Sequence, residues 1–191
     1  SGSLMVDDNL FVYDPIQGNS YNVTGVIGYS YGNFEMMPRF NADIQLEPST
    51  PIVTITDIQT PGAGSDSSLY NNQTVTTSGV VTAVNASTGY WIQEPAGGPY
   101  SGVYVYDVSN NPTIGDYVTI TGTIYEFYGL TNFNNVTSFN QLSSGNGFTI
   151  TTLTTNAVNS EMYEGVMVNV TNATCTQDTN QYGEWIINDG S

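Results

Sequence analysis

Four aspartates form the clearest set of possible metal ligands in this sequence: Asp7, Asp8, Asp14 and Asp189. The first three lie close together, and Asp189 joins them if the end of the chain is placed before its beginning. Carboxylates combined with turn carbonyls are typical calcium ligands. The spacing lacks the EF-hand pattern, and a solvated acidic loop explains the same residues. Calcium is therefore one expectation, and an acidic loop is the other.

Enzymatic chemistry has few candidates. Glu94 and Glu126 come nearest to a glycosidase acid–base pair, but neither lies in a motif. The 191 residues include 17 acidic residues, one Arg, no Lys and no His, which gives a net charge of −16. This composition excludes a Ser-His-Asp triad, a His-ligated metal and a Schiff base. We therefore expect no enzymatic activity and no required cofactor. Because Arg39 alone cannot neutralise phosphates, we also expect no nucleic-acid partner.

Aromatic residues offer another kind of site, because base or sugar rings stack on exposed aromatic side chains. Since cations are scarce, a sugar is the expected ligand rather than a nucleic acid. The alternative is a structural role, in which strand alternation divides these rings between the core and cross-strand pairs. The residues concerned are Tyr90, Trp91, Tyr104, Tyr106, Tyr125, Phe127 and Tyr128.

Two residues that occur once in the chain are expected to be structural. Cys175 excludes an internal disulfide and is expected to be a small buried hydrophobe, with an intermolecular disulfide as the alternative. Arg39 is expected to pair with Asp43 or Glu35.

Asn-x-Ser/Thr sequons mark possible glycosylation sites, which matter if the protein is secreted by a cell that glycosylates. A chain rich in Asn and Thr also produces sequons by chance. The acceptor residues are Asn22, Asn72, Asn85, Asn135, Asn169 and Asn172.

The elements that must position these residues are strands. Thr, Val, Ile and Tyr alternate with turn residues, and convincing helical periodicity is scarce. No run of 18 apolar residues is present, so we expect no membrane insertion. Five strands within about 70 residues indicate a small Greek-key barrel such as the OB-fold. A further strand is expected at Ile52–Ile58. The five are predicted at Gln73–Val84, Tyr90–Gln93, Gly102–Tyr106, Tyr117–Phe127 and Asn134–Phe139.

Internal comparison reveals a repeat that runs across the ends of the chain. Val118–Ile124 matches residues 21–27 with an offset of 97, and the offset persists to the Tyr-Gly pairs at 128–129 and 31–32. Residues 103–107 resemble 10–14. At the other end, Gly183–Ile186 matches Gly89–Ile92, so that Trp91 and Trp185 are expected to share a core role. The predicted organisation is half a barrel over 1–46, a complete barrel over 47–147 and the complementary half over 148–191.

A half barrel exposes an apolar face and unpaired strand edges, which favours closure. The two halves can close within one chain, between neighbouring chains, or between periods of a longer chain. A ragged fragment is the alternative explanation. Closure between copies is head-to-tail, and such contacts generate filaments when they do not close into rings. The expected contact residues are Leu4, Val6, Leu10, Val12, Val23, Val26, Val166, Val168, Val170, Trp185, Ile186 and Ile187.

The chain resembles a known group over nearly its whole length: the OB-fold-like domains of large secreted bacterial proteins. Such domains are often attached to endonuclease/exonuclease/phosphatase-type nucleases or to surface-anchored proteins, and the resemblance implies the barrel fold and an extracellular or cell-surface location. A catalytic domain of that kind has no counterpart among these residues. The matching segments are Thr74–Val84, Gly89–Glu94, Ser101–Tyr106, Gly115–Gly122, Gly183–Ser191 and Asn33–Arg39.

From these observations we expect an acidic, secreted, non-enzymatic protein built of tandem OB-like barrels. Its expected role is that of the repeating subunit of an extracellular filament or surface array, with copies of itself as partner. The alternatives are a sugar- or nucleic-acid-binding accessory module of a secreted hydrolase, and a calcium-stabilised adhesin segment.

Overall fold

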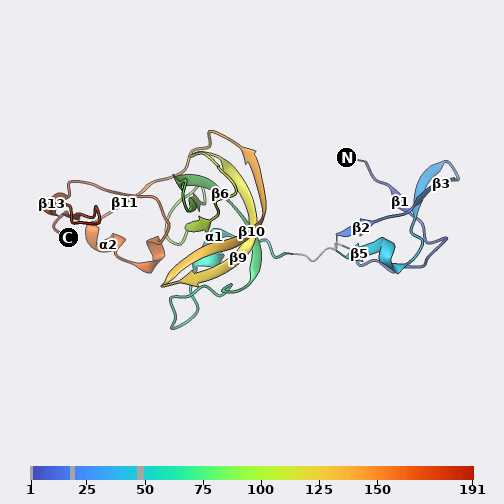
Figure 1. Ribbon diagram of the computed structural model, residues 1–191, viewed down its shortest axis with the longest axis horizontal. Coiled ribbons are helices and arrows are strands. Elements are labelled where there is room, and N and C mark those ends of the chain that lie inside the picture. Colours follow the sequence, from blue (N-terminus) through green and yellow to red (C-terminus); the bar gives the residue numbers. More distant parts are fainter. Residues whose placement is uncertain (1, 18–19, 47–49) are drawn as a thin grey trace. The chain divides into compact units, whose positions relative to one another are not determined.

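The structure is a computed structural model that describes residues 2–17, 20–46 and 50–191. The chain divides into two compact units, Ser1–Ser49 and Thr50–Ser191, and strands dominate both (Figure 1). The all-β expectation is therefore confirmed. Among the described residues, no helix has the length and apolar character needed to cross a membrane.

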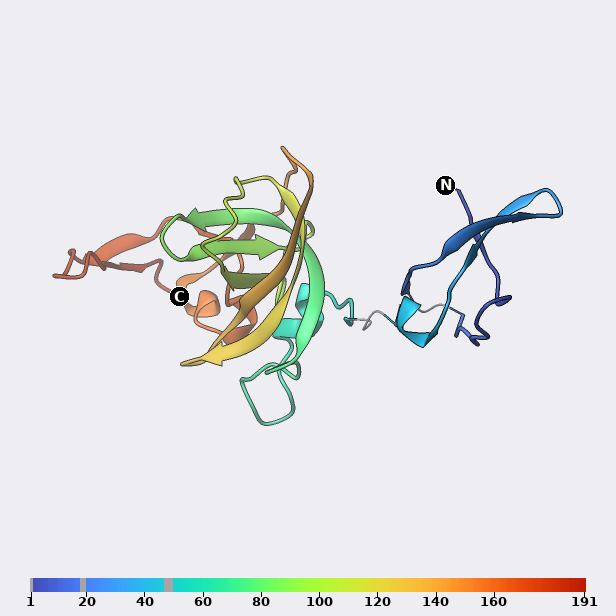
Figure 2. The same ribbon diagram turned by 45° about the vertical axis from the view of Figure 1, so that its right-hand side comes forward.

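A closed barrel of five strands forms the centre of the second unit (Figure 2). Its strands are β6 (Thr74–Asn85), β7 (Gly89–Gln93), β8 (Gly102–Tyr106), β9 (Tyr117–Phe127) and β10 (Leu130–Ser143). They follow the order β6-β7-β8-β10-β9 and return to β6, and every pairing is antiparallel except the parallel β8–β10 pair. These are the five predicted strands, although β10 extends beyond its predicted range at both ends.

Alternate side chains of these strands fill the barrel, because successive residues of a strand point to opposite faces. Phe133 and Tyr90 are among the fully buried residues. The ring of Tyr90 meets that of Phe139 edge-on, with centroids 6.2 Å apart, and its hydroxyl donates to Oδ2 of Asp107 at 3.3 Å. Burial, and next the negative charge of Asp107, raise the pKa of Tyr90 far above its usual value.

The strand expected at Ile52–Ile58 is wrong, because the helix α1 (Ile55–Gln59) lies there. Thr54 and Asp57 form a capping box at its start, in which each side chain accepts a hydrogen bond from the other residue's backbone N–H. Ile55 and Ile58 lie one turn apart and are fully buried in the barrel core. An isolated parallel bridge between Ile52 and Thr76 remains at the start of the expected strand.

Residues after the barrel form a segment of short elements. These are β11 (Thr151–Leu153), α2 (Thr155–Val158), η2 (Glu161–Tyr163), β12 (Val168–Val170), β13 (Thr174–Gln177) and β14 (Ile186–Asn188). The buried amide of Gln93 ties this segment to the barrel, since it donates to Thr149 O and accepts from Met167 N, both at 2.8 Å. Two hydrogen bonds of one side chain thus connect the barrel to the first part of the segment.

The N-terminal unit is formed of two small sheets. Its elements are β1 (Met5–Val6), β2 (Tyr21–Val23), β3 (Val26–Ser30), β4 (Asn33–Met37), η1 (Asn41–Asp43) and β5 (Ile44–Leu46). One sheet has the order β1-β4-β3, and β2 pairs with β5 in the other. Arg39 binds the buried carboxylate of Asp43 through Nε and Nη2, both at 2.8 Å, as one of its two expected pairings predicted.

Candidate functional site

The N-terminal unit repeats the last three strands of the barrel. In it β4 pairs in parallel with β1 and antiparallel with β3, as β10 pairs in parallel with β8 and antiparallel with β9. Met36 pairs with Val6 in the parallel ladder, and Phe133 pairs with Val105 in the corresponding one. The counterpart of β8 is therefore β1, and the sequence match to residues 10–14 placed it too far along the chain.

The hairpins of the two units share one turn and one register. Tyr31-Gly32 joins β3 to β4 with φ angles of 45° and 90°, and Tyr128-Gly129 joins β9 to β10 with 52° and 86°. Two successive positive φ angles are typical of a type I′ hairpin turn. Each pair of the β3–β4 ladder has its counterpart 97 residues later in β9–β10. The sequence offset therefore corresponds to a repeat in hydrogen bonding.

The register changes only beyond the hairpin, where η1 lies between β4 and β5. Val23 pairs with Ile44 in the β2–β5 ladder, and its counterpart Ile120 pairs with Phe139. Ile44 thus takes the position of Phe139 in the repeated pattern.

The C-terminal segment, residues 148–191, repeats the elements that begin the barrel. Thr54 caps α1, and Thr154 caps α2 with a side chain that accepts from the backbone three residues later. The residues before α1 make a parallel bridge to β6, and β11, which precedes α2, pairs in parallel with β12. The order of leading strand, capped helix and next strand is thus the same in both places.

The β13–β14 hairpin continues this likeness into the counterpart of β6–β7. Val81 pairs with Ile92, and a one-residue bulge follows in β6. Cys175 pairs with Ile187, and a one-residue bulge follows in β13. Aligned on their bulges, the two hairpins place Ile187 at the position of Ile92.

This alignment corrects the sequence match of the two tryptophans. Trp185 takes the position of Tyr90 and not that of Trp91. Trp91 is half-buried on the outer side of the barrel and packs on Tyr104, with centroids 4.6 Å apart and planes at 42°. The expected core role is therefore wrong for Trp91. Trp185 is 59% exposed within the single chain.

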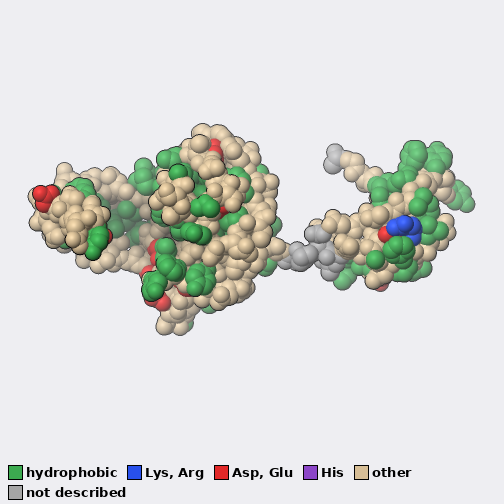
Figure 3. All heavy atoms as spheres, viewed as in Figure 1, with side chains coloured by type: hydrophobic (Ala, Val, Ile, Leu, Met, Phe, Trp, Pro, Cys, Tyr) green, Lys and Arg blue, Asp and Glu red, His purple; other side chains and the backbone are tan. Residues whose placement is uncertain are grey.

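Both pieces leave apolar side chains uncovered within the described residues. The N-terminal unit there has counterparts of β8, β9 and β10, and the C-terminal segment has counterparts of β6 and β7. Hydrophobic side chains gather over the β3–β4 hairpin (Figure 3). Of the expected contact residues, Val166 is buried, and Val23, Val168 and Val170 are half-buried. The exposed ones are Leu4, Val6, Leu10, Val12, Val26, Trp185, Ile186 and Ile187.

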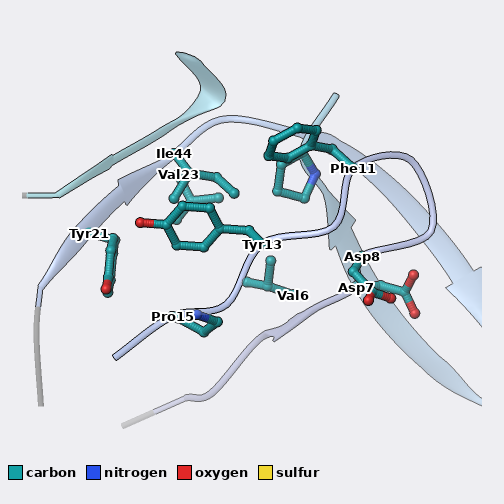
Figure 4. A pocket seen from close by; sticks show the side chains of 10 residues that line it. Val6, Asp7, Asp8, Phe11, Tyr13, Pro15, Tyr21, Val23 and Ile44 are labelled. Atoms are coloured by element: carbon teal, nitrogen blue, oxygen red, sulfur yellow. The ribbon is translucent and has the colours of Figure 1, made fainter. Parts of the chain in front are cut away.

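A pocket of about 180 Å³ opens on the N-terminal unit (Figure 4). The Tyr13 ring lies between Tyr21 and Phe11, and its centroid is 5.8 Å from that of Tyr21 in an edge-on contact. The apolar run at residues 10–13 was the sequence signal for Phe11 and Tyr13, which were not among the predicted site residues. The lining residues are Val6, Asp7, Asp8, Phe11, Tyr13, Pro15, Tyr21, Val23, Pro38 and Ile44.

The four expected calcium ligands do not form a site within the part of the chain that the structure describes. No group of three or more His, Cys, Asp or Glu side chains there is placed to hold a metal ion. Asp189 accepts hydrogen bonds from Thr155 Oγ1 at 2.6 Å and from Thr155 N at 3.1 Å. These bonds, with those from Ser191, keep the pKa of Asp189 well below its usual range. Asp7 Oδ1 accepts from Asn9 N at 2.8 Å.

The two candidate catalytic carboxylates each accept a hydrogen bond from a backbone N–H. Glu94 accepts from Thr56 N in α1 at 2.8 Å. Glu126 Oε1 accepts from Ser68 N at 2.8 Å and from Thr131 Oγ1 at 2.7 Å.

Cys175 is exposed in the single chain, contrary to its expected burial. Among the described residues β13 belongs to a two-stranded sheet with β14, and all four of its residues are exposed. The six sequon asparagines are all exposed as well, so glycosylation remains a prediction.

The aromatic residues divide between the core and the surface as strand alternation predicted. Tyr90 enters the core, whereas Tyr104, Tyr106, Tyr125 and Phe127 line an outer groove of about 570 Å³. Its other lining residues are Thr88, Leu130, Asn132 and Asn134. The lining side chains are uncharged, and the aromatic ones come from two strands, β8 and β9.

No protein-family model, curated protein or solved structure compared with the chain matches it. The likeness between the chain's own parts is therefore what supports a function.

Proposed function

We propose that the protein is the repeating subunit of an extracellular filament or surface array. In this assembly residues 148–191 of one copy complete the half barrel of residues 1–46 of the next. The observation that carries the proposal is the pairing pattern. The β1–β4–β3 sheet follows the registers of β8–β10–β9, and the β13–β14 hairpin follows the bulged register of β6–β7. The C-terminal segment has counterparts of β6 and β7. The described part of the N-terminal unit has counterparts of β8, β9 and β10 and none of β6 or β7.

We assign both barrels to the OB-like Greek-key class. The support is the closed five-strand order, with a single parallel pair between β8 and β10. The resemblance to OB-fold-like domains of secreted bacterial proteins supports an extracellular or cell-surface location.

The physical drive for completion is strand pairing combined with apolar burial. Uncovered strand edges and apolar faces favour pairing with another chain. In strand addition, an extended segment pairs with the exposed edge of a sheet. Here a whole hairpin is added in the same way. The expected contact residues are all uncharged. This matters because each copy has a net charge of −16, and identical acidic units associate best through neutral surfaces.

Sedimentation and electron microscopy of the purified chain test this proposal. The chain is expected to form polymers whose length grows with concentration, and Ile187→Asp in β14 is expected to abolish them. Ile114→Asp is the matched control, because Ile114 is 63% exposed in a loop of the complete barrel. Polymers that survive Ile187→Asp, or a chain that stays monomeric at every concentration, would contradict the proposal.

The repeat can run between separate chains or along one longer chain. The intact mass of the native material separates the two arrangements. The mass of one unit, with or without glycans, indicates separate chains, and a multiple of that mass indicates a tandem array.

The outer groove supports a second candidate function, the binding of carbohydrate. Its walls combine aromatic faces for stacking with the amide of Asn134 for hydrogen bonds. Tyr106→Ala, which removes a ring that is half exposed in the groove, is expected to weaken binding of a neutral oligosaccharide about tenfold. Tyr128→Ala, in the exposed turn, is the control. Gel electrophoresis in the presence of soluble polysaccharides measures the difference, and equal mobility of both variants and the unmodified chain would contradict this function.

A further inference from the structure

The complete barrel shows how an aromatic residue of β7 closes the core. The ring of Tyr90 packs edge-on against Phe139, and its hydroxyl reaches Asp107, the residue that follows β8. Asp107 also accepts from Ser109 N at 2.8 Å, which fixes its side chain in a turn. The aromatic ring and its polar end thus each have a partner inside the barrel.

The N-terminal unit contains the same two partners. Ile44 stands opposite Val23, as Phe139 stands opposite Ile120. The parallel ladder gives Asp8 the position of Asp107, because Val6 takes the position of Val105. Asp7, beside it, accepts from Asn9 N at 2.8 Å.

A counterpart of Tyr90 is what the described part of this unit lacks, and a pocket lies beside the two partners. Its volume is about 180 Å³, and Val23, Ile44 and Asp8 all line it (Figure 4). An apolar cavity of roughly 150 Å³ is large enough to hold a benzene ring. The pocket therefore has room for one aromatic side chain, and a carboxylate lies at its edge.

We propose that the pocket receives the side chain of Trp185 from the neighbouring copy. The β13–β14 register places Trp185 at the position of Tyr90, and its side chain is exposed in the single chain. Its ring then packs on Val23 and Ile44. The indole N–H donates to the carboxylate of Asp8, because a buried Trp N–H usually finds an acceptor. This inference rests on the proposed head-to-tail assembly and names the side chain that anchors it.

Fluorescence of the full chain tests the inference. Trp91→Phe leaves Trp185 as the single tryptophan, because the chain contains two. On assembly, followed independently by sedimentation, the emission of Trp185 is expected to shift to shorter wavelength and its quenching by acrylamide to fall severalfold. Polymers in which Trp185 remains fully quenchable would overturn this inference and leave the proposed function intact. Absence of polymers under all conditions would overturn both.

Two substitutions of Trp185 test whether its side chain stabilises the contact between copies. Trp185→Phe keeps an aromatic ring but removes the N–H donor, and Trp185→Ala removes both. The concentration needed for assembly is expected to rise with Trp185→Phe and severalfold further with Trp185→Ala. Filling the pocket by Val23→Phe is expected to have an effect as large as Trp185→Ala. Unchanged assembly by Trp185→Ala would overturn the inference.

Discussion

Val6 and Met36 lie side by side in a parallel ladder, and this pair reproduces the pairing of Val105 with Phe133 in the complete barrel. Parallel pairing between strands of a small barrel is the less common arrangement, since antiparallel pairs outnumber parallel ones. Its occurrence at matching positions of two hairpin-bearing sheets is the strongest sign that the N-terminal unit is part of a barrel. The strands that would close this half barrel are the counterparts of β6 and β7, and they lie at the other end of the chain.

Phe133→Ala is expected to destabilise the complete barrel by about 3–5 kcal/mol, because the ring is fully buried and its removal leaves a cavity. Urea unfolding followed by far-ultraviolet circular dichroism measures the loss. Phe127→Ala is the matched control on the outer face, where the ring is 56% exposed, and it is expected to change stability by less than about 0.5 kcal/mol. Equal effects of the two substitutions would contradict the assignment of the core.

Thr54→Ala is expected to cost about 1 kcal/mol, because it removes the capping box of α1, whose isoleucines are buried in the core. Thr154→Ala makes the same change at α2, which has no buried residue, and is expected to affect global unfolding less. Denaturant midpoints of the two variants provide the comparison. A larger loss from Thr154→Ala would show that α1 is not part of the barrel's stable core.

Stability is expected to fall as the pH rises from about 4.5 to about 7. Burial, and next the charge of Glu161, raise the pKa of Glu164 from 4.5 to about 7, although the hydrogen bond from Thr131 N at 2.9 Å opposes the rise. A carboxyl group with a raised pKa binds its proton more tightly in the folded state. Its stabilising effect is therefore complete below the unfolded pKa and lost as the pH passes the folded pKa.

Glu164→Gln isolates this contribution, since the amide oxygen can still accept from Thr131 N. Thermal unfolding between pH 4.5 and 8 is expected to vary less with pH in this variant than in the unmodified chain. An unaltered pH dependence would contradict the account of Glu164.

Assembly is expected to protect Cys175 from thiol reagents. The bulged register gives Cys175 the position of Val81, which is fully buried in the complete barrel, whereas Cys175 is exposed in the single chain. The rate of labelling is expected to drop in polymers, and the assembly-deficient Ile187→Asp variant provides the fast reference rate. Equal rates in polymer and monomer would show that β13 stays uncovered.

Apolar alternation predicted the five barrel strands, because each is long enough to show which face is buried. The repeat offset of 97 also appeared in the sequence, because Val118–Ile124 matches residues 21–27 and the same offset relates the two Tyr-Gly turns. Alternation gave the wrong prediction at α1. The β-branched residues there favour a strand, but the capping box and the burial of the helix against the core stabilise a helix. Sequence matching also failed to align Trp185, because the connection from Gln177 to its partner Ile186 is one residue longer than that from Ala83 to Trp91, which is not visible without the hydrogen-bond ladders.

Mixing two singly defective variants tests head-to-tail completion most directly. Val23→Asp disables the half barrel of the N-terminal unit and leaves β13–β14 intact, whereas Ile187→Asp does the reverse. Each variant alone is expected to sediment as a monomer, and an equimolar mixture is expected to form a one-to-one dimer and nothing larger, since one working contact remains. A mixture that stays monomeric, or either variant forming polymers alone, would contradict the completion of one copy's barrel by the next.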